Sequence, residues 1–471
     1  MLTLRDQGAR MCDGLTRREV LHMGSLGFLG LSLPALLRGR VAAATREGSS
    51  TQPHGARARS CILLFLMGGP PQHSTWDPKP DAPELVRGLF KPIATSVPGI
   101  RISELMPRLA RLANQLCLLR AVATDDNAHS SSGYYMLTGY PHQPTNFENA
   151  NPGPPNNWPT LGAYLHRLRQ VPGATLPAAV RLPHRIYNTD GSVWPGQDAG
   201  LLGRNADPWL LRCEPASANY QIPEFHLAQD VPRKRLGSRR GLLERINQRF
   251  EAVERGGGLH RYDTQTQQAF DLLRSAPSRQ AFDLDREPEP VRERYGRSQF
   301  GQSVLLARRL VEAGVSLVQV NWFRGPDEPA DNPCWDSHTN ESERLKTVLV
   351  PPMDQAFSAL LEDLAWRGML DETLVVCLAE FGRTPKFNGR AGRDHWGHVF
   401  SVALAGGGIR GGQVYGVSDK IGGYPKEGRV MPPDLVATLF HCLGYPPDTE
   451  VHDTLGRPLP LSRGRVIRQI L

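Results

Sequence analysis

Cysteine is scarce in this sequence and follows no regular spacing. Seven cysteines occur among 471 residues, one of them, Cys12, lies close to the N-terminus, and no two have the CxxC spacing of a zinc ribbon. Cys61 and Cys377 lie in apolar stretches, where a buried thiol is expected. We therefore predict neither a cysteine-based zinc site nor a disulfide framework, and one disulfide among the loop cysteines stays open.

Long apolar runs and dense basic blocks are also lacking. Beyond the N-terminus no segment approaches the roughly 20 apolar residues that cross a bilayer, so no stable membrane span is expected in the mature chain. The net charge of +8 is scattered, apart from Arg233-Lys234-Arg235 and Arg239-Arg240. No basic run alternates with aromatic residues as in a nucleic-acid groove, so no nucleic-acid partner is expected.

The overall composition is that of a folded protein. Apolar residues make up 40% and charged residues 22% of the chain, which suffices for a large core. One domain with insertions and two domains are both compatible with this length.

The N-terminus has the features of an export signal. Arg17 and Arg18 precede a moderately apolar stretch from Met23 to Leu37, which Ala42-Ala43-Ala44 close. Residues 1–44 therefore resemble a twin-arginine signal, which implies the twin-arginine translocon as a transient partner and a periplasmic or extracellular location. An uncleaved N-terminal anchor is the alternative. Residues 45–60 read as a polar linker.

From residue 61 onward, short apolar strands alternate with helices. The predicted strands span residues 61–67, 116–122, 314–322, 374–378 and 400–405. The predicted helices span residues 105–115, 239–255, 299–313 and 348–367. This alternation predicts an α/β fold, a mostly parallel central sheet with helices on both faces. Residues 61–471 would form a single domain, with a loop-rich and helical insertion at about 140–300.

Potential metal ligands follow or precede these strands. They are His73 after the first strand, Asp336 and His338 after the third, Glu380 after the fourth, and Asp394, His395 and His398 before the fifth. Because ligands bind outside the carboxyl ends of parallel strands, we expect these side chains to converge.

Mixed carboxylate and imidazole ligands predict a divalent metal. Zinc, manganese and calcium stay open as its identity. His338 and His395 are the firmest predicted ligands, while His73 and His398 could equally support other ligands or contact substrate.

Several segments resemble a known family. They are residues 63–69, 129–139, 380–385, 392–398 and 455–460, and they are similar to the bacterial family called domain of unknown function 1501. That family in turn resembles the alkaline phosphatase and sulfatase superfamily, which implies an alkaline-phosphatase-like fold. The resemblance also implies a site near His395, which matches a metal ligand of the superfamily, and near Asp336 and His338, which match its other Asp/His pair.

The resemblance also exposes departures from the superfamily pattern. His129 stands at the position of the nucleophile and Ser130 follows it, without the Cys or Ser, Pro and Arg needed for conversion to formylglycine. His129 could therefore bind metal, leaving Ser130 or a water molecule to attack. Met67 replaces an expected acid and Glu380-Phe381 replace an Asp-His pair, which implies one metal or a rearranged pair. Arg383 would hold an anionic oxygen of the substrate or form a structural salt bridge.

These observations favour a secreted, metal-dependent hydrolase of phosphate or sulfate esters, sulfatase-like but without formylglycine. Its substrate would be a small-molecule or polysaccharide ester. The alternative is a non-catalytic protein of the same fold that binds polysaccharide or another component of the cell envelope. An enzyme that acts on sugar through paired carboxylates ranks last, because Asp125 and Asp126 are chain neighbours and seldom face each other.

Overall fold

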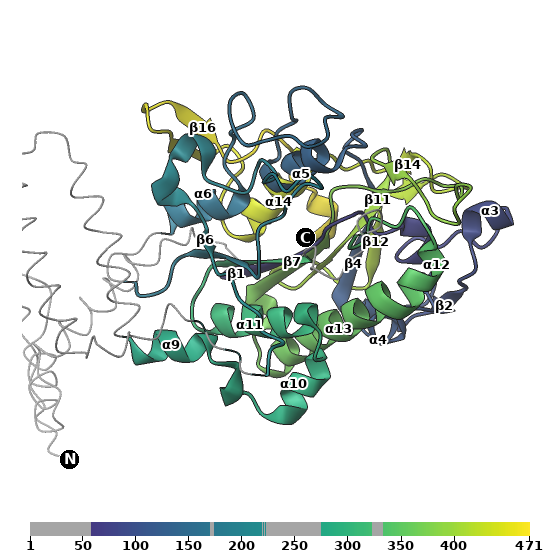
Figure 1. The fold of residues 1–471 in the computed structure, drawn as a ribbon, viewed down its shortest axis with the longest axis horizontal. Coiled ribbons are helices and arrows are strands. Elements are labelled where there is room, and N and C mark those ends of the chain that lie inside the picture. The colour runs from purple at the N-terminus through teal and green to yellow at the C-terminus, as the bar shows by residue number, and fades with distance from the viewer. Residues whose placement is uncertain (1–57, 170–173, 219, 221, 223–274, 323–332) are drawn as a thin grey trace, which may run out of the picture. The chain divides into compact units, whose positions relative to one another are not determined.

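An eight-stranded sheet forms the centre of the protein (Figure 1). The computed structural model describes residues 58–169, 174–218, 220, 222, 275–322 and 333–471. The strands, in their order across the sheet, are β12 (Gln413–Tyr415), β4 (Leu116–Val122), β11 (Phe400–Ala405), β8 (Thr373–Leu378), β1 (Ser60–Leu66), β7 (Leu317–Trp322), β5 (Ala179–Leu182) and β6 (Trp209–Leu210).

Within the eight-stranded sheet, all strand pairs are parallel except the two that involve β11. This strand runs antiparallel to β4 on one side and to β8 on the other. Phe400, at its start, pairs with Val122 at the end of β4. The residues that precede β11 therefore lie at the edge where the other strands end, which is the edge where ligands bind in sheets of this type.

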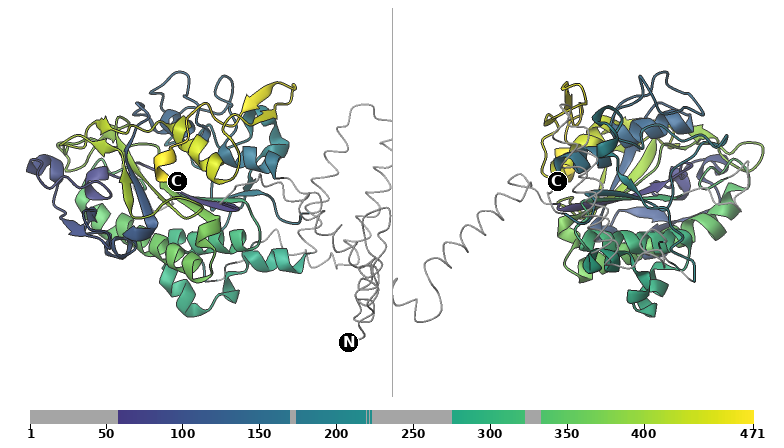
Figure 2. Two further views of the ribbon diagram at one scale, coloured as in Figure 1. Left: turned by 180° about the vertical axis from the view of Figure 1, so that it is seen from behind. Right: turned by 60° about the vertical axis from the view of Figure 1, so that its left-hand side comes forward.

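The central strands are apolar because both of their faces are covered. Every residue of β1 and of β8 is buried, which is typical of parallel strands between two layers of helices. Helices α11 (Gln299–Glu312) and α13 (Val350–Trp366) cover one face, and α5 (His129–Thr138), α6 (Leu161–Leu168) and α14 (Pro432–Cys442) cover the other (Figures 1 and 2).

Shorter elements surround this three-layer core. The remaining α-helices are α3 (Glu84–Arg87), α4 (Pro107–Arg111), α9 (Ala276–Phe282), α10 (Glu289–Tyr295) and α12 (Glu341–Arg344). Four two-stranded ribbons complete the sheets: β2–β3 (Pro92–Ala94, Arg101–Ser103), β9–β10 (Gly382–Arg383, His395–Trp396), β13–β14 (Val417–Ser418, Pro425–Glu427) and β15–β16 (Glu450–His452, Pro458–Pro460).

The predicted α/β class and the five predicted strands are confirmed as β1, β4, β7, β8 and β11. Of the predicted helices, 299–313 and 348–367 correspond to α11 and α13, while 105–115 is shorter and splits into α4 and a 3-10 turn. The segment at 140–300 differs from the expected covering insertion. It contributes β5 and β6 to the sheet itself, since Ala179–Leu182 pairs parallel to β7 and Trp209–Leu210 pairs parallel to β5.

Several predictions lie outside the described residues. These are the signal at 1–44, most of the linker at 45–60, the helix at 239–255 and the basic groups at 233–240. Among the described helices, none has the length and apolar character needed to cross a membrane. Cys61 and Cys377 are buried and in no disulfide, as predicted.

Gly133→Ala tests how α5 packs against the core. In an exposed helix this change stabilises by about 1 kcal/mol, but a Cβ at Gly133 would lie 2.3 Å from the Trp194 ring. Trp194 is fully buried and its ring packs edge-on against Phe65 of β1, so a shift of the ring would disturb the core. We therefore expect a loss of about 1 to 3 kcal/mol in the free energy of unfolding, measured by urea denaturation. A gain in stability would contradict this packing.

Candidate metal site

Four loops bring polar side chains together at the carboxyl edge of the sheet. His129 begins α5 shortly after β4, Asp336 and His338 lie beyond β7, and His395 lies in β10 just before β11. The fifth residue, Glu380, follows β8. Of the residues expected to converge, Asp336, His338, Glu380 and His395 lie together, and His129 contacts Asp336 and Glu380. The buried Phe381 ring lies beside the His129 and His395 rings.

Three potential ligand atoms form a tight triangle. Nε2 of His338 lies 2.9 Å from Nε2 of His395 and 2.9 Å from Oδ1 of Asp336. Nε2 of His395 lies 3.1 Å from the same oxygen. Ligand atoms about 2.0 to 2.1 Å from one metal ion would lie about 2.9 to 3.4 Å from each other, so the triangle has the dimensions of a coordination shell.

The other nitrogen of each histidine fixes which atom carries the ring proton. Nδ1 of His338 lies 3.0 Å from Oδ1 of Asp394, and Nδ1 of His395 lies 2.7 Å from the carbonyl oxygen of Asn127. Both partners accept hydrogen bonds, so both Nδ1 atoms donate. When both rings are neutral, their lone pairs are on the two Nε2 atoms, which lie close to each other and to a carboxylate oxygen. A cation would stabilise this arrangement.

The surroundings of His395 keep it in the form that binds metal. Burial, the neighbouring His129 and Arg383 lower the pKa of His395 to about 3. A neutral imidazole is the form that ligates. Arg383 is fully buried and donates to Oδ1 of Asp336 at 2.5 Å, which fixes that carboxylate. Burial opposes its ionisation, but His129 and Arg383 hold the Asp336 pKa well below its usual range.

His129 lies between two carboxylates. Its Nδ1 is 2.7 Å from Oε1 of Glu380, and its Nε2 is 3.2 Å from Oδ2 of Asp336. Burial alone would lower the pKa of His129, but Asp336 and Glu380 outweigh burial and raise it to about 10. In the metal-free protein His129 is therefore a buried cation between two carboxyl groups.

Stability of the metal-free protein should depend on pH through His129. Because the folded-state pKa of about 10 exceeds the unfolded value of about 6.5, this stabilisation is complete below the unfolded value. It is lost as the pH rises toward the folded value. We expect the difference in unfolding free energy between wild type and His129→Asn, both treated with chelator, to be larger at about pH 6 than at about pH 9.5. An equal difference at both pH values in urea denaturation would contradict the charged pair.

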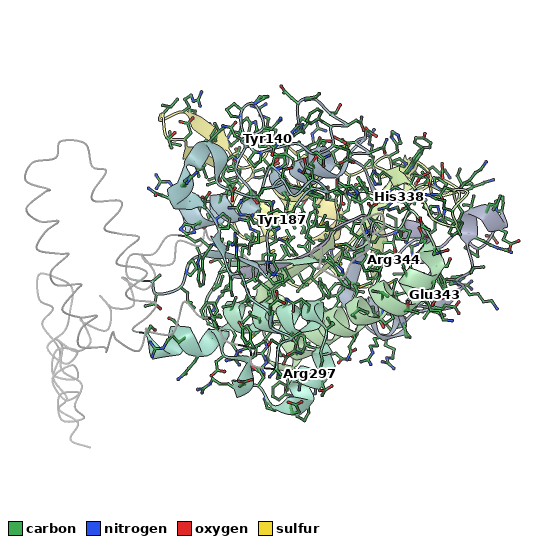
Figure 3. The ribbon with its side chains drawn as sticks, viewed as in Figure 1. Tyr140, Tyr187, Arg297, His338, Glu343 and Arg344 are labelled. Carbon is green, nitrogen blue, oxygen red and sulfur yellow. The ribbon has the colours of Figure 1, made fainter. Side chains whose placement is uncertain are left out.

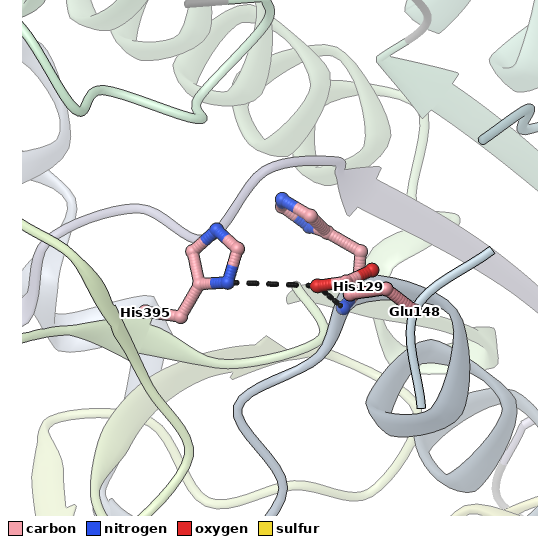
Figure 4. Close-up of side chains that lie close together, drawn as sticks. All are labelled: His129, Glu148 and His395. Atoms are coloured by element: carbon pink, nitrogen blue, oxygen red, sulfur yellow. Dashed lines mark hydrogen bonds and ion pairs between the residues drawn. The ribbon is translucent and has the colours of Figure 1, made fainter. Parts of the chain in front are cut away.

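Two further carboxylates border the site. Glu380 is fully buried, and its Oε2 has no hydrogen-bond partner, which leaves one lone-pair-bearing atom inside the site. Glu148 lies in the loop after α5. Its Oε1 accepts from the backbone N–H of His129 at 2.9 Å and lies 3.7 Å from Nδ1 of His395 (Figure 4). Glu148 was not predicted, because an exposed loop residue carries no periodic signal.

The geometry thus provides two sets of candidate ligands. One is Asp336, His338 and His395, and the other is His129, Glu148 and His395. The first is the better donor set, because its three candidate ligand atoms lie only 2.9 to 3.1 Å from one another. The second set shares His395, and the His395 nitrogen that lies 3.7 Å from Glu148 is the one that donates to Asn127.

Two predicted catalytic residues have structural roles instead. The hydroxyl of Ser130 is buried, donates to the carbonyl of Phe147 and accepts from the N–H of Ala150. Arg383 donates to Gly68, Gly69, Arg393 and Trp335 carbonyls in addition to Asp336. Of the two roles predicted for Arg383, the guanidinium therefore has the structural one, a salt bridge. It presents no free edge to a substrate oxygen.

Four predicted metal ligands lie outside the triangle. Glu380 binds Nδ1 of His129 instead. Asp394 is half-exposed and orients His338. His398 pairs with Asp125 at 3.2 Å, so it contacts the loop after β4. His73 is buried in a 3-10 turn after β1, and its Nε2 bonds to the carbonyl of Ile421 at 2.7 Å.

Comparisons with known proteins give a family and several distant folds. The model of the family described as "Protein of unknown function (DUF1501)" matches residues 58–471, which confirms the resemblance found in the sequence. No curated protein sequence matches the chain.

Solved structures similar to the chain include the protein Ps i-CgsB in complex with k-i-k-neocarrahexaose, at 12% identity and a TM-score of 0.41, covering 83% of this chain and 72% of the other. The PsFucS1 sulfatase from Pseudoalteromonas sp. is 12% identical with a TM-score of 0.34, and the match covers 81% of this chain and 70% of the other. The phosphonate monoester hydrolase SpPMH from Silicibacter pomeroyi is 12% identical with a TM-score of 0.29, and the match covers 87% of this chain and 76% of the other. The chemistry of this chain must therefore be inferred from its own site.

Proposed function

Because this chain belongs to the DUF1501 family, whose description names no reaction, we propose from the site itself that it is a metal-dependent hydrolase of phosphate or sulfate esters. The triangle of lone-pair atoms from Asp336, His338 and His395, with sides of 2.9 to 3.1 Å, carries this proposal. A divalent cation held there would neutralise and polarise an anionic ester. Two imidazoles and one carboxylate favour zinc or manganese over calcium.

His129 is the proposed proton carrier. Its Nδ1–H donates to Glu380, so its Nε2 is the atom that faces the ligand set. A carboxylate that holds the imidazole from behind is the arrangement of a histidine base. A cation bound at the triangle would offset the negative charge that raises the pKa of His129 in the metal-free protein, so that Nε2 could accept a proton. In the proposed reaction a water oxygen attacks the phosphorus or sulfur atom, His129 accepts the water proton at Nε2, and the ester bond to the alcohol oxygen breaks. His129 then returns the proton to that oxygen.

Water is the proposed attacking group because the nearby hydroxyls are committed elsewhere. Ser130 bonds to Phe147, Ser131 donates to Asp126, and Ser132 donates to the carbonyl of Glu380. All three are completely buried. Catalysis would thus proceed by direct displacement, without a covalent enzyme intermediate on serine.

The negative surroundings of the site also favour a metal. Asp336 forms one corner of the triangle, and Glu380, Glu148 and Asp394 lie around it. Arg383 pairs with Asp336. An anionic ester would be repelled by these carboxylates unless a cation offset them. The twin-arginine-type sequence at residues 1–44 leads us to propose that the hydrolase works in the periplasm or outside the cell.

A non-catalytic function is the second candidate. Arg383 is fully occupied by carbonyls and Asp336, and the serine hydroxyls at the start of α5 are buried. Both observations favour a protein that uses the metal site to bind an envelope polysaccharide without cleaving it.

Metal content and turnover together separate the two candidates. The protein is purified without added ions, its metals are measured by mass spectrometry, and nitrophenyl phosphates and sulfates are screened, with His395→Ala as the inactive reference. Bound metal with metal-dependent turnover supports the hydrolase. Bound metal with no turnover of any ester supports the binding protein, and the absence of metal removes both proposals.

Ser130→Ala tests the attack by water. Loss of two hydrogen bonds to Phe147 and Ala150 should cost about 1 to 3 kcal/mol of unfolding free energy. The kcat/KM for a nitrophenyl ester should stay within about threefold of wild type, because the hydroxyl takes no part in the reaction. A fall of several hundredfold with intact folding would identify Ser130 as the nucleophile.

A further inference from the structure

Three aromatic side chains form a cluster next to the metal ligand His395. Trp396, His398 and Tyr424, here called the aromatic platform, have ring centroids 4.7 Å apart for Trp396 and His398, 5.5 Å for Trp396 and Tyr424, and 5.3 Å for His398 and Tyr424. Tyr424 is 51% exposed. A large aromatic ring held at the surface next to a candidate active site needs a physical explanation.

The loop that carries Tyr424 has a fixed internal shape. Oδ1 of Asp419 accepts hydrogen bonds from the N–H groups of Ile421 and Gly423 at 3.1 and 2.8 Å. The backbone N–H of Asp419 donates to the carbonyl of Tyr424 at 2.8 Å. Such an aspartate-centred turn limits the conformations of the loop before anything binds.

Buried side chains of the protein body also hold this loop. Nε2 of Gln72 donates to the carbonyl of Gly422 at 3.0 Å, Nε2 of His73 lies 2.7 Å from the carbonyl of Ile421, and Nε1 of Trp396 donates to the carbonyl of Gly423 at 2.6 Å. Gln72 and His73 are completely buried. The loop is thus fixed at three consecutive carbonyls while the side chains of Ile421 and Tyr424 stay exposed.

Charged groups border the platform. Nδ1 of His398 lies 3.2 Å from Oδ1 of Asp125, and Arg429 pairs with the other oxygen of Asp125. About half of the Asp125 and Arg429 side chains is exposed. Rigid rings flanked by hydrogen-bonding groups suit a ligand that has both apolar faces and polar edges.

The platform and the metal site share the same backbone segments. Trp396 follows His395 in β10. The loop that supplies Asp125 to His398 also supplies the Asn127 carbonyl to His395. A ligand bound on the platform would therefore lie beside the candidate reaction centre.

We propose that the aromatic platform binds a sugar ring of the substrate, so that the ester is carried by a carbohydrate. The inference deepens the proposed hydrolase function and rests on it. The C–H face of a pyranose ring is apolar and flat enough to stack on Tyr424, and its hydroxyls reach the charged border at Asp125 and Arg429. A fixed platform reduces the ordering cost of binding such a ligand.

Affinity electrophoresis in native gels tests the platform independently of turnover. Gels contain κ-carrageenan, chondroitin sulfate or neutral dextran, and the full-length protein is compared with Tyr424→Ala, Tyr424→Phe and Trp366→Ala. Trp366 is a matched control because it is an 81% exposed aromatic residue on α13. All these variants have the net charge of the wild type, so nonspecific attraction to an anionic polymer is equal among them.

Retardation by at least one of these polymers is expected for the wild type, Tyr424→Phe and Trp366→Ala. Tyr424→Ala should raise the apparent Kd roughly tenfold, the size of a lost ring contact. Equal retardation of Tyr424→Ala, no retardation by any polymer, or a dimer in light scattering that only Tyr424→Ala disrupts would overturn the proposal. Platform-dependent binding without ester turnover would leave the platform standing and remove only the hydrolase.

Discussion

His395→Ala is expected to abolish both metal binding and ester hydrolysis. Loss of a residue that merely supports a ligand weakens metal binding or activity by about 10- to 100-fold, so loss of the ligand itself should exceed that range. We expect metal content below about one tenth of the wild-type value and a fall in kcat/KM of at least about a thousandfold. Nε2 of His395 is one corner of the triangle, and the atoms of His338 and Asp336 alone leave the shell incomplete.

His398→Gln is the matched control for this loss. His398 lies three residues further along the chain and pairs with Asp125 instead of joining the triangle. This variant should keep its metal, whatever its effect on the binding of a large substrate. Metal lost from both variants would indicate a general disturbance of the loop, and metal retained by His395→Ala would refute the assigned ligand set.

Glu341→Gln is expected to cost about 3 to 5 kcal/mol of unfolding free energy, because it leaves a buried charge without its partner. Glu341 and Arg393 are both fully buried and lie 3.1 Å apart. Arg393 also donates to the carbonyls of Val86, Thr384 and Pro385. The pair thereby joins the segment that follows Asp336 to the segment that precedes His395, and weaker metal binding should accompany the loss of stability.

Glu343→Gln provides the comparison within the same short helix. Glu343 is exposed on α12 and is labelled in Figure 3. Its neutralisation should change the unfolding free energy by less than about 0.5 kcal/mol. Chemical denaturation of both variants under one set of conditions measures the difference. Equal effects would show that Arg393 does not depend on Glu341.

The central strands were predictable because their composition is extreme. β1 and β8 are short, apolar on both faces and flanked by turn residues. A short apolar run between turn residues is typical of a strand that is buried on both faces. β5 and β6 were missed for the converse reason. They are four and two residues long within a segment rich in proline and glycine. Their place in the sheet depends on the pairing of β5 with β7 and of β6 with β5, and not on local pattern.

The location of the site was predictable from where polar residues stand relative to strands. His338 and His395 follow that rule, and they lie 2.9 Å apart despite their separation in sequence. The position of a residue relative to a strand does not predict the direction in which its side chain points. Arg383 stands where an anion-binding arginine would, yet its guanidinium turns inward to Gly69 and Asp336. Glu148 reaches the site only through the path of its loop.

The reversed strand β11 has a consequence for the order of assembly. It separates β4 and β12 from the five strands on its other side, so these halves have no direct ladder until residues 400–405 exist. His129 enters with one half, and Asp336 and His338 enter with the other. A nascent chain that ends before β11 would therefore lack the means to hold these side chains at one place, and the proposed metal site would form only late in the maturation of the chain.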